Sequence, residues 1–223
     1  MKIEIISEHA DWLVAYKPEN LDFHDNQGES GFFSLLSAQV GYKLYPVHRL
    51  DKPTSGLMLV AKHEMACRQL NELFRDGNID KFYLAVVGNK LKKKQGKVKG
   101  DMTKARNGSF KLLKTLENPA LTQFISVSLM PKYRLCLLKP KTGRTHQLRV
   151  ALKSLAAPII GDKRYGGEVS DRLYLHAYGL AFNWQGKQHC FSVLPTDGVL
   201  FKSTEMTQCL ESWQAPWQLN WPQ

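Results

Sequence analysis

The sequence predicts an α+β protein with a mixed, largely antiparallel central sheet flanked by helices and loops. Apolar runs of strand length come in neighbouring pairs, such as residues 2–6 with 12–16 and residues 122–129 with 133–138. Other stretches carry apolar residues at the spacing of an amphipathic helix. Strands that pair with their chain neighbours run antiparallel, so this pattern favours an antiparallel sheet with separate helices.

Three helical stretches are bordered by residues that commonly start or stop helices. They are residues 30–41, 63–76 and 145–155. Ser30 and Thr145 are expected N-caps, because their hydroxyl oxygens can accept the unpaired amides of a first helical turn. Gly41 and Gly77 are expected stops, since glycine readily adopts the left-handed backbone that ends a helix. The apolar side chains between these borders predict one buried face for each helix.

The remaining strands are predicted from apolar runs. Residues 57–61 are apolar without interruption and predict a strand buried on both faces. Later strands are predicted at residues 81–88, 173–182 and 188–194. The tail carries three tryptophans at four-residue intervals between residues 213 and 221, but Pro216 argues against a single helix there. We expect this tail to dock onto the domain.

Composition favours one globular domain over residues 1–223, since 43% of the residues are hydrophobic and five are Trp. No run approaches the ~18 apolar residues of a membrane span, and acidic residues interrupt the apolar N-terminus, so no signal peptide is predicted. The four cysteines and seven histidines are scattered and form neither a zinc ribbon nor a thioredoxin motif. We therefore expect a cytoplasmic protein with free thiols, no membrane and no metal.

The net charge of +11 favours a polyanionic partner, either nucleic acid or a membrane surface. Residues 90–114 contain ten Lys or Arg and a single acid, Asp101. Glycines interrupt this stretch, so we predict one or two mobile basic hairpins inserted at about 89–115. A solvated loop would explain the same charges. Their concentration favours phosphate contacts instead, with Lys92, Lys93 and Lys94 as candidates.

A polar loop, residues 48–56, precedes the buried strand and carries Asp51 in its middle, with a basic residue on either side. A rigid scaffold commonly presents reactive groups on such a loop. A plain surface turn, with Asp51 bonding nearby amides, would explain the same residues. A protein-kinase catalytic loop is excluded, because Gly56 replaces the required Asn. A serine hydrolase is excluded because Gly-x-Ser-x-Gly is absent around Ser55.

The segment His48-Arg-Leu-Asp-Lys-Pro-Thr-Ser-Gly-Leu57 resembles the signature of the RluA family of pseudouridine synthases, in which the Asp is catalytic. Residues 12–18 resemble the preceding family hairpin with its terminal Lys-Pro, although Tyr16 stands where an acidic residue is common. Residues 81–87 resemble the family's Lys-x-Tyr-x-Ala-x-Val segment. Thr142-Gly-Arg-Thr-His-Gln-Leu-Arg-Val150 resembles its third motif, and Gly-Asp-x-x-Tyr-Gly follows. The motifs occur in family order.

The resemblance implies the pseudouridine synthase fold and a role for individual residues. It makes Asp51 the catalytic carboxylate, places Tyr83 against the target base, and pairs Arg149 with Asp51. Residues expected to contact RNA or substrate are His48, Arg49, Thr54, Arg144, His146 and Leu148. Ordinary strand packing would also explain Tyr83, and solvation of a helix charge would explain Arg149. Ala151 stands where the family usually has His, which concerns local substrate contacts more than the chemistry.

Isomerising uridine to pseudouridine breaks the C1′–N1 bond, rotates the base and forms a C1′–C5 bond. No electrons are exchanged and no group arrives or leaves, so the reaction requires no metal or organic cofactor. It requires a carboxylate near the reacting carbons, a cation that keeps it ionised, and a pocket for an unstacked base. Direct attack at C1′ and a route through 2′-deprotonation both fit these requirements.

The resemblance therefore implies a stand-alone catalytic domain that isomerises uridine in ribosomal or transfer RNA, with no room for the S4-type module of many relatives. We expect a small domain of this kind to be a monomer. Two other functions fit parts of the sequence. A non-catalytic RNA-binding or ribosome-assembly factor on the same fold would use the basic segment without needing Asp51. A nucleotide or glycoside hydrolase using Asp51 would need a second carboxylate, which the motifs do not supply.

Overall fold

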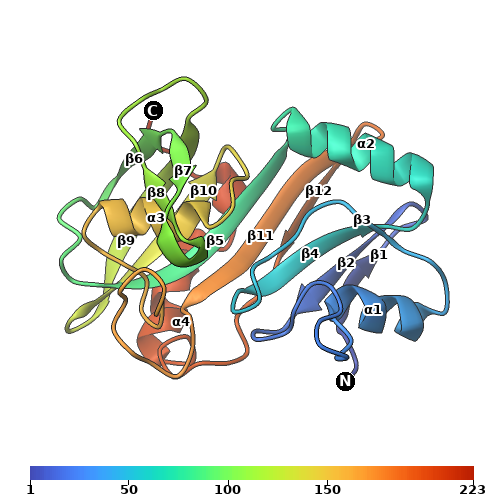
Figure 1. Ribbon diagram of the computed structural model, residues 1–223, viewed down its shortest axis with the longest axis horizontal. Helices are drawn as coiled ribbons and strands as arrows, with labels where there is room; N and C mark the ends of the chain where they lie inside the picture. The colour runs from blue at the N-terminus through green and yellow to red at the C-terminus, as the bar shows by residue number, and fades with distance from the viewer. The chain divides into compact units, whose positions relative to one another are not determined.

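The computed structural model describes residues 1–223. It divides into two compact units, each made of two stretches of the chain. The first unit comprises Met1–Ile79 and Leu180–Leu194, and the second comprises Asp80–Gly179 and Pro195–Gln223. Figure 1 labels the elements of both units.

The strands of the first unit pair antiparallel around a buried central strand. β1 (Ile5–Glu8) pairs with β2 (Trp12–Lys17), and β2 pairs with β4 (Ser55–Ala61). β3 (Tyr45–Pro46) also pairs with β4. Every residue of β2 and β4 is buried, which confirms the predicted strand after the polar loop.

α1 (Phe32–Val40) has the predicted end but not the predicted start. Gly41 ends it with φ 77°, in the left-handed region. Its N-cap is Gly31 without a side-chain cap, so the expectation of Ser30 at this position is wrong. A Cβ on Gly31 would lie 2.4 Å from the carbonyl carbon of His24. A tertiary close approach, rather than a capping hydroxyl, therefore sets the start of the helix.

α2 (Glu64–Arg75) lies within the predicted range and buries one face. His63 is its N-cap, and the ring Nδ1 accepts a hydrogen bond from the amide of Ala66 at 3.2 Å. Gly77 follows the helix with φ 74°, as predicted. Ala66 and Leu70 join the hydrophobic core of the first unit.

β11 (Leu175–Trp184) ends in the first unit and pairs with β12 (Lys187–Ser192). The turn between them consists of Gln185 and Gly186, with φ of 51° and 83°. Positive φ at both positions is the geometry that joins twisted antiparallel strands through two residues. The predicted strand pair is therefore confirmed, with slightly shifted ends.

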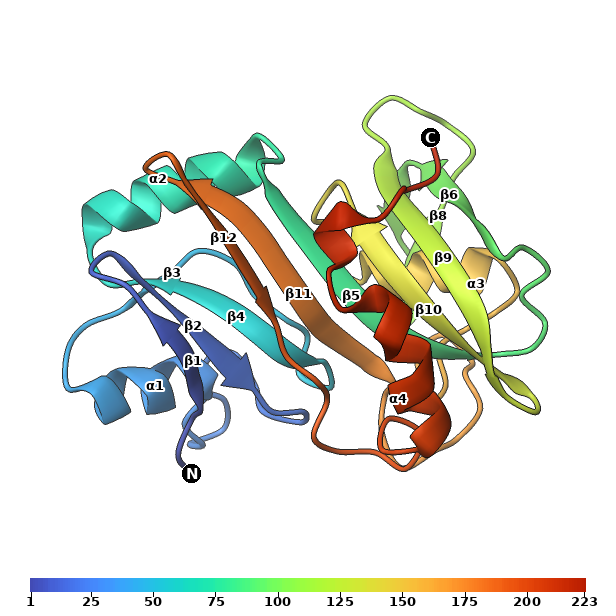
Figure 2. The ribbon, with the colours of Figure 1, turned by 180° about the vertical axis from the view of Figure 1, so that it is seen from behind.

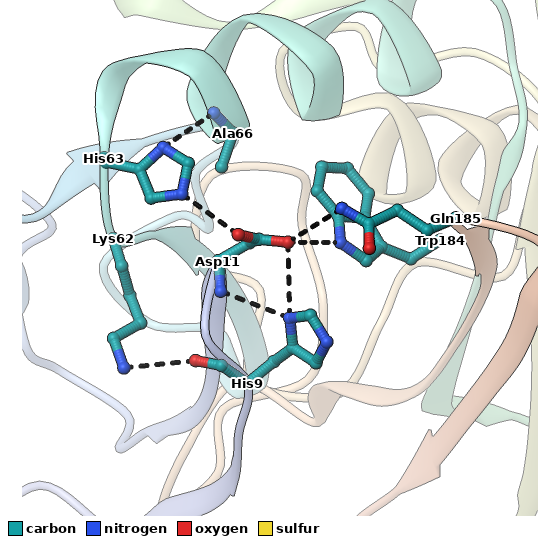
Figure 3. Close-up of polar contacts among 7 residues, drawn as sticks. All are labelled: His9, Asp11, Lys62, His63, Ala66, Trp184 and Gln185. Atoms are coloured by element: carbon teal, nitrogen blue, oxygen red, sulfur yellow. Dashed lines mark hydrogen bonds and ion pairs between the residues drawn. The ribbon is translucent and has the colours of Figure 1, made fainter.

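The carboxylate of Asp11 ties the β1–β2 turn to two other segments of the first unit (Figure 3). One oxygen accepts hydrogen bonds from Trp184 Nε1 at 2.8 Å and Gln185 Nε2 at 3.2 Å. The other lies 3.0 Å from His63 Nε2. Because His63 Nδ1 accepts an amide, a neutral ring carries its proton on Nε2 and donates it to Asp11. The hydrogen bonds from Trp184 and then His63 lower the pKa of the Asp11 carboxyl.

The strands of the second unit are also antiparallel. β5 (Ile79–Gly88) pairs with β10 (Tyr133–Pro140), β10 pairs with β9 (Ala120–Met130), and β9 pairs with β6 (Gln95–Gly100). The strand pair predicted after residue 120 is present and longer than predicted. β6 comes from the basic segment, so part of that segment is a strand of the sheet.

The rest of the basic segment contains a small separate hairpin. β7 (Met102–Lys104) and β8 (Phe110–Leu112) pair antiparallel and are joined through a 3-10 turn at Arg106–Gly108. β8 packs against α3 (Gln147–Ser154), the helix of the third motif. We refer to residues 102–112 as the basic hairpin.

α3 begins later than the sequence predicts. Its N-cap is His146, in a left-handed conformation with φ 57° and no side-chain cap, so the expectation of Thr145 as cap is wrong. The side chain of Gln147 orders the turn instead. Its Oε1 accepts the hydroxyl of Thr142 at 2.7 Å and the amide of Arg144 at 3.0 Å. A glutamine from inside the helix thus takes the place of the capping hydroxyl.

The C-terminal tail packs on the second unit, as predicted. α4 (Thr204–Leu210) and two 3-10 turns, Glu211–Trp213 and Pro216–Gln218, lie on one side of the sheet of the second unit (Figure 2), and α4 packs against β9. The ring of Phe82 on β5 lies 5.8 Å from that of Trp221. The tail therefore covers the sheet face that carries Phe82.

Both units are α+β, and the strand registers described above are antiparallel. The fold class predicted from the sequence is confirmed. No helix is both long and apolar enough to cross a membrane.

Candidate active site

The loop that carries Asp51 connects β3 to β4 in the first unit. The amide of Thr54 donates to the carbonyl of Asp51 at 2.9 Å and closes a four-residue turn. Thr54 is buried, Asp51 is half-buried, and Arg49 is exposed. The turn fixes the backbone of Asp51 one residue after the buried Leu50 and three before buried Thr54.

Lys17 holds the same loop from the other side. Its side chain is fully buried, and Nζ donates to the carbonyls of Pro18 at 2.9 Å, Leu21 at 2.7 Å and Lys52 at 3.0 Å. One buried ammonium therefore binds backbone carbonyls at three points of the chain. Because Lys52 is the neighbour of Asp51, Lys17 fixes the peptide next to the predicted catalytic residue.

His48 fastens the start of the loop to β4. Its Nε2 accepts the amide of Leu59 at 2.8 Å, so a neutral ring has its proton on Nδ1. The ring also stacks on Phe74 of α2, with centroids 4.7 Å apart. These contacts make His48 part of the scaffold of the loop. Its predicted contact with RNA stays a prediction.

The side chain of Tyr83 lies on the face of β5 opposite to Phe82, because successive strand residues alternate. Phe82 is fully buried beneath the C-terminal tail, whereas Tyr83 is half-buried. Lys81 shares the face of Tyr83. Burial lowers the pKa of the Lys81 ammonium, against the opposing charge of Asp80. The tail thus supports one face of β5, and the predicted base-contacting residue belongs to the other.

Arg149 on α3 is buried, which excludes a solvated helix charge. Its guanidinium forms two parallel hydrogen bonds with the carboxylate of Asp162, from Nε and from Nη2, each 2.8 Å long. Asp162 is also buried, at 1% exposure. A buried bidentate pair compensates both charges and fixes the plane of the guanidinium.

Tyr165 completes the setting of Arg149. The guanidinium lies over its ring, 5.0 Å from the centroid. The hydroxyl accepts the amide of Phe110 at 3.0 Å and lies 2.8 Å from His146 Nδ1. Burial raises the pKa of this phenol. Sequence reasoning assigned no role to Asp162 or Tyr165, although the Gly-Asp-x-x-Tyr-Gly match was the signal that could have identified them.

The other residues predicted in the third motif differ in setting. Arg144 is exposed, and its Nη2 donates a hydrogen bond to Asn118 Oδ1. His146 is half-buried against Tyr165 and Phe110. Leu148 is buried at 7% exposure and packs in the protein. Arg144 is therefore the most accessible of the three.

Lys92, Lys93 and Lys94 precede β6, and all three are exposed. The backbone of this stretch is hydrogen-bonded to β9, whereas the lysine side chains are exposed to solvent. The hydroxyl of Ser126 on β9 donates to the carbonyls of Lys93 at 3.3 Å and Lys94 at 3.0 Å. The sheet therefore presents three neighbouring cations on an anchored backbone.

The predicted residues fall into two groups. The Asp51 loop with His48, Arg49 and Thr54 belongs to the first unit. The second unit holds Tyr83, the third-motif residues around Arg149, and the lysines before β6. Each group contains a buried cation, Lys17 in one and Arg149 in the other, that is hydrogen-bonded within its own unit.

The family model described as RNA pseudouridylate synthase matches residues 11–154, which include Asp51, Tyr83 and Arg149. An uncharacterized RNA pseudouridine synthase of Haemophilus influenzae is 46% identical over 201 residues, covering 89% of this chain and 90% of that protein. The ribosomal large subunit pseudouridine synthase D of Borreliella burgdorferi is 35% identical over 80% of this chain, which spans 60% of the relative's length.

A solved structure agrees in fold. Human RNA pseudouridylate synthase domain containing 1 has a TM-score of 0.76 with 22% identity, covering 96% of this chain and 95% of that one. The resemblance to the RluA family that the motifs indicate is thereby confirmed. This chain belongs to the RNA pseudouridylate synthase family, isomerases that convert uridine in RNA to pseudouridine.

Proposed function

We propose that this protein isomerises particular uridines in ribosomal or transfer RNA, with Asp51 as the catalytic carboxylate. The setting of the Asp51 loop supports this most strongly. Lys17, a fully buried cation, donates to three backbone carbonyls, one of them in the residue adjacent to Asp51. An ordinary surface turn needs no such anchor. Catalysis does, because a reacting carboxylate must be held in place before the transition state forms.

Asp51 acts near C1′, C2′ or C6 of the target nucleotide in this proposal. Arg149 is the cation that the family resemblance pairs with Asp51, and its plane is set by Asp162. Tyr83 lies against the unstacked base. The leaving N1 and the incoming C5 belong to one base, so the protein must hold that base while it rotates.

The basic segment contacts RNA phosphates. Lys92, Lys93 and Lys94 are exposed on a backbone fastened to β9. Arg49 and Arg144 are exposed as well and add positive charge near the first and third motifs. A neutral nucleoside would gain little from these charges, whereas an RNA loop would gain both phosphate contacts and a lower cost of unstacking.

In this proposal both units form one catalytic domain, because the family motifs are divided between them. The protein is a cytoplasmic monomer without a metal. Sedimentation with and without RNA would test the monomer, and a dimer in free solution would contradict it.

Tritium release from RNA labelled at uridine C5 tests the reaction, since forming the C1′–C5 bond expels that hydrogen. Unmodified ribosomal and transfer RNA are the two substrates, and Asp51→Asn is compared with the wild type. We expect Asp51→Asn to fold, to bind RNA and to lose activity by on the order of 10³-fold or more. Asp76→Asn, an exposed aspartate of the same unit, is the matched control. Release by Asp51→Asn near the wild-type rate would exclude Asp51 as the catalytic group.

A further inference from the structure

Tyr165 makes contacts in two directions within the second unit. On one side its hydroxyl accepts the amide of Phe110, the first residue of β8 in the basic hairpin. On the other side its ring lies beneath the guanidinium of Arg149. The side chain is buried, since only 6% is exposed. One phenol therefore connects a surface hairpin to the buried arginine of the third motif.

The basic hairpin is held at its turn by the same loop. Arg164 Nη1 donates a hydrogen bond to the carbonyl of Asn107 at 2.8 Å. Lys104, Arg106 and Lys111 of the hairpin are exposed, so its outer side is cationic. Arg164 and Tyr165 thus bind the hairpin at its turn and at its second strand. The three basic side chains stay exposed to solvent.

The loop is equally fixed toward Arg149. The amide of Tyr165 donates to Asp162 Oδ1 at 3.3 Å, and the same oxygen accepts a hydrogen bond from Arg149 Nη2 at 2.8 Å. Gly161 has φ 80°, and a Cβ there would lie 1.7 Å from the carbonyl oxygen of Arg172. The loop therefore has little freedom to move without moving Asp162.

We propose that Tyr165 is a positioning residue that couples the basic hairpin to Arg149, so that RNA phosphates bound by the hairpin set the orientation of the guanidinium. The proposal rests on the proposed function, because it takes the hairpin as an RNA contact and Arg149 as part of the active site. RNA that reaches the hairpin restrains the Phe110 strand, and the Tyr165 hydroxyl and the Asp162 carboxylate carry that restraint to Arg149. The hairpin then affects the rate of isomerisation as well as affinity.

Tyr165→Phe is the sharpest test, because it keeps the ring under Arg149 and removes only the hydroxyl. Tyr174→Phe is a closely matched control. The Tyr174 hydroxyl also accepts a backbone amide, from Leu200 at 3.1 Å, and donates to a side chain, Asp171 at 2.6 Å. Each variant loses one hydrogen bond with a backbone amide and one with a side chain, from a buried phenol of the second unit. A purely structural role predicts the same effect for both.

The coupling is measured by combining Tyr165→Phe with a neutralised hairpin, Lys104→Gln, Arg106→Gln and Lys111→Gln. The single-turnover rate at saturating RNA is compared with the Kd for the same RNA, an unmodified transcript of large-subunit ribosomal RNA. We expect Tyr165→Phe to lower the rate about tenfold with a smaller change in Kd. The neutralised hairpin should lower the rate in the wild-type background and should affect only Kd once Tyr165 is Phe.

Independent effects on the rate, or a Tyr165→Phe rate no lower than that of Tyr174→Phe, would overturn the coupling. Hydrogen exchange gives a second readout that needs no turnover. With the same transcript bound, wild type should show slower exchange at residues 102–112 and at 147–154. In Tyr165→Phe the protection should stop at the hairpin. Equal protection of α3 in both proteins, or no protection of the hairpin, would contradict the proposal. If the wild type makes no pseudouridine, the proposed function fails, and the exchange data still decide the coupling.

Discussion

Two buried cations, Lys17 in the first unit and Arg149 in the second, are held in different ways. Lys17 donates to three backbone carbonyls, whereas Arg149 forms a bidentate pair with the Asp162 carboxylate. The carbonyl partners belong to the chain itself, so Lys17 shapes a loop. The carboxylate belongs to a side chain, so Asp162 orients a charged group and compensates its charge. The first arrangement fixes the backbone of a loop, and the second fixes the plane of a guanidinium.

This difference predicts which contact a second substitution can rescue. A carboxylate can be removed together with its arginine, and replacing both members of a buried pair by apolar groups is often neutral. Backbone carbonyls cannot be removed. We therefore expect that replacing Arg149 and Asp162 together preserves most of the stability, whereas no second substitution restores the stability lost on replacing Lys17.

The largest effect on stability is expected for Asp162→Asn. It replaces the carboxylate that pairs with Nε and Nη2 of the buried Arg149 by a neutral amide, and breaking a buried pair in this way costs about 3–5 kcal/mol. Urea unfolding measures the loss. The double variant Arg149→Met with Asp162→Leu should regain most of the stability while staying inactive. A double variant as unstable as the sum of its two single variants would break the comparison.

Lys17→Met should cost somewhat less, about 2–3 kcal/mol, because it leaves three backbone carbonyls without their donor. It should also lower activity, since the peptide after Asp51 loses its anchor. Urea unfolding and the tritium assay measure the two effects. Lys43→Met, at an exposed lysine of the same unit, is the control and should leave both unchanged. Full activity of a folded Lys17→Met protein would show that the loop needs no anchor.

Asp11 extends the comparison to a carboxylate that accepts hydrogen bonds from the side chains of Trp184, Gln185 and His63. Its pKa is lowered in the folded protein from an ordinary value of 3.8. A lowered folded pKa means that this stabilisation is complete above the unfolded pKa and is lost as the pH falls through the folded one. Asp11→Asn should therefore cost about 1–2 kcal/mol at neutral pH and progressively less in acid.

Unfolding at pH 7 and in the acid range below pH 4, followed in urea, measures this dependence. Glu64→Gln, at an exposed carboxylate of the same unit, serves as the control. A loss of stability in Asp11→Asn that stays constant with pH would show that the carboxylate contributes packing rather than charge.

The smallest effect on stability is expected for the exposed cations of Lys92, Lys93 and Lys94. Changing all three to Gln should leave unfolding unchanged and weaken RNA binding. The slope of log K against log salt should fall by about 0.7–0.9 for each RNA phosphate that the variant no longer neutralises. Changing Lys2, Lys43 and Lys187 to Gln removes the same charge elsewhere. Equal slopes for the two triple variants would show that Lys92, Lys93 and Lys94 make no particular contact with RNA phosphates.

The sequence alone determined the family and most of the longer elements. Alternation and helical spacing are local patterns, so the hairpins, α2 and the doubly buried β4 could be predicted from them. The motif around Asp51 was equally local. Helix starts were less predictable: Gly31 caps α1 because the chain near His24 passes too close for a side chain. The side chain of Gln147 replaces the expected hydroxyl at α3.

Only the tertiary structure decided the partners of the buried charges. Arg149 meets Asp162 thirteen residues later, and Tyr165 meets Phe110 fifty-five residues earlier. Lys17 meets Lys52 across thirty-five residues. Such pairs depend on the path of the chain between them, which local residue patterns do not encode. A buried charge requires a partner on physical grounds, but the sequence cannot say which one, because burial itself arises only when distant segments pack together.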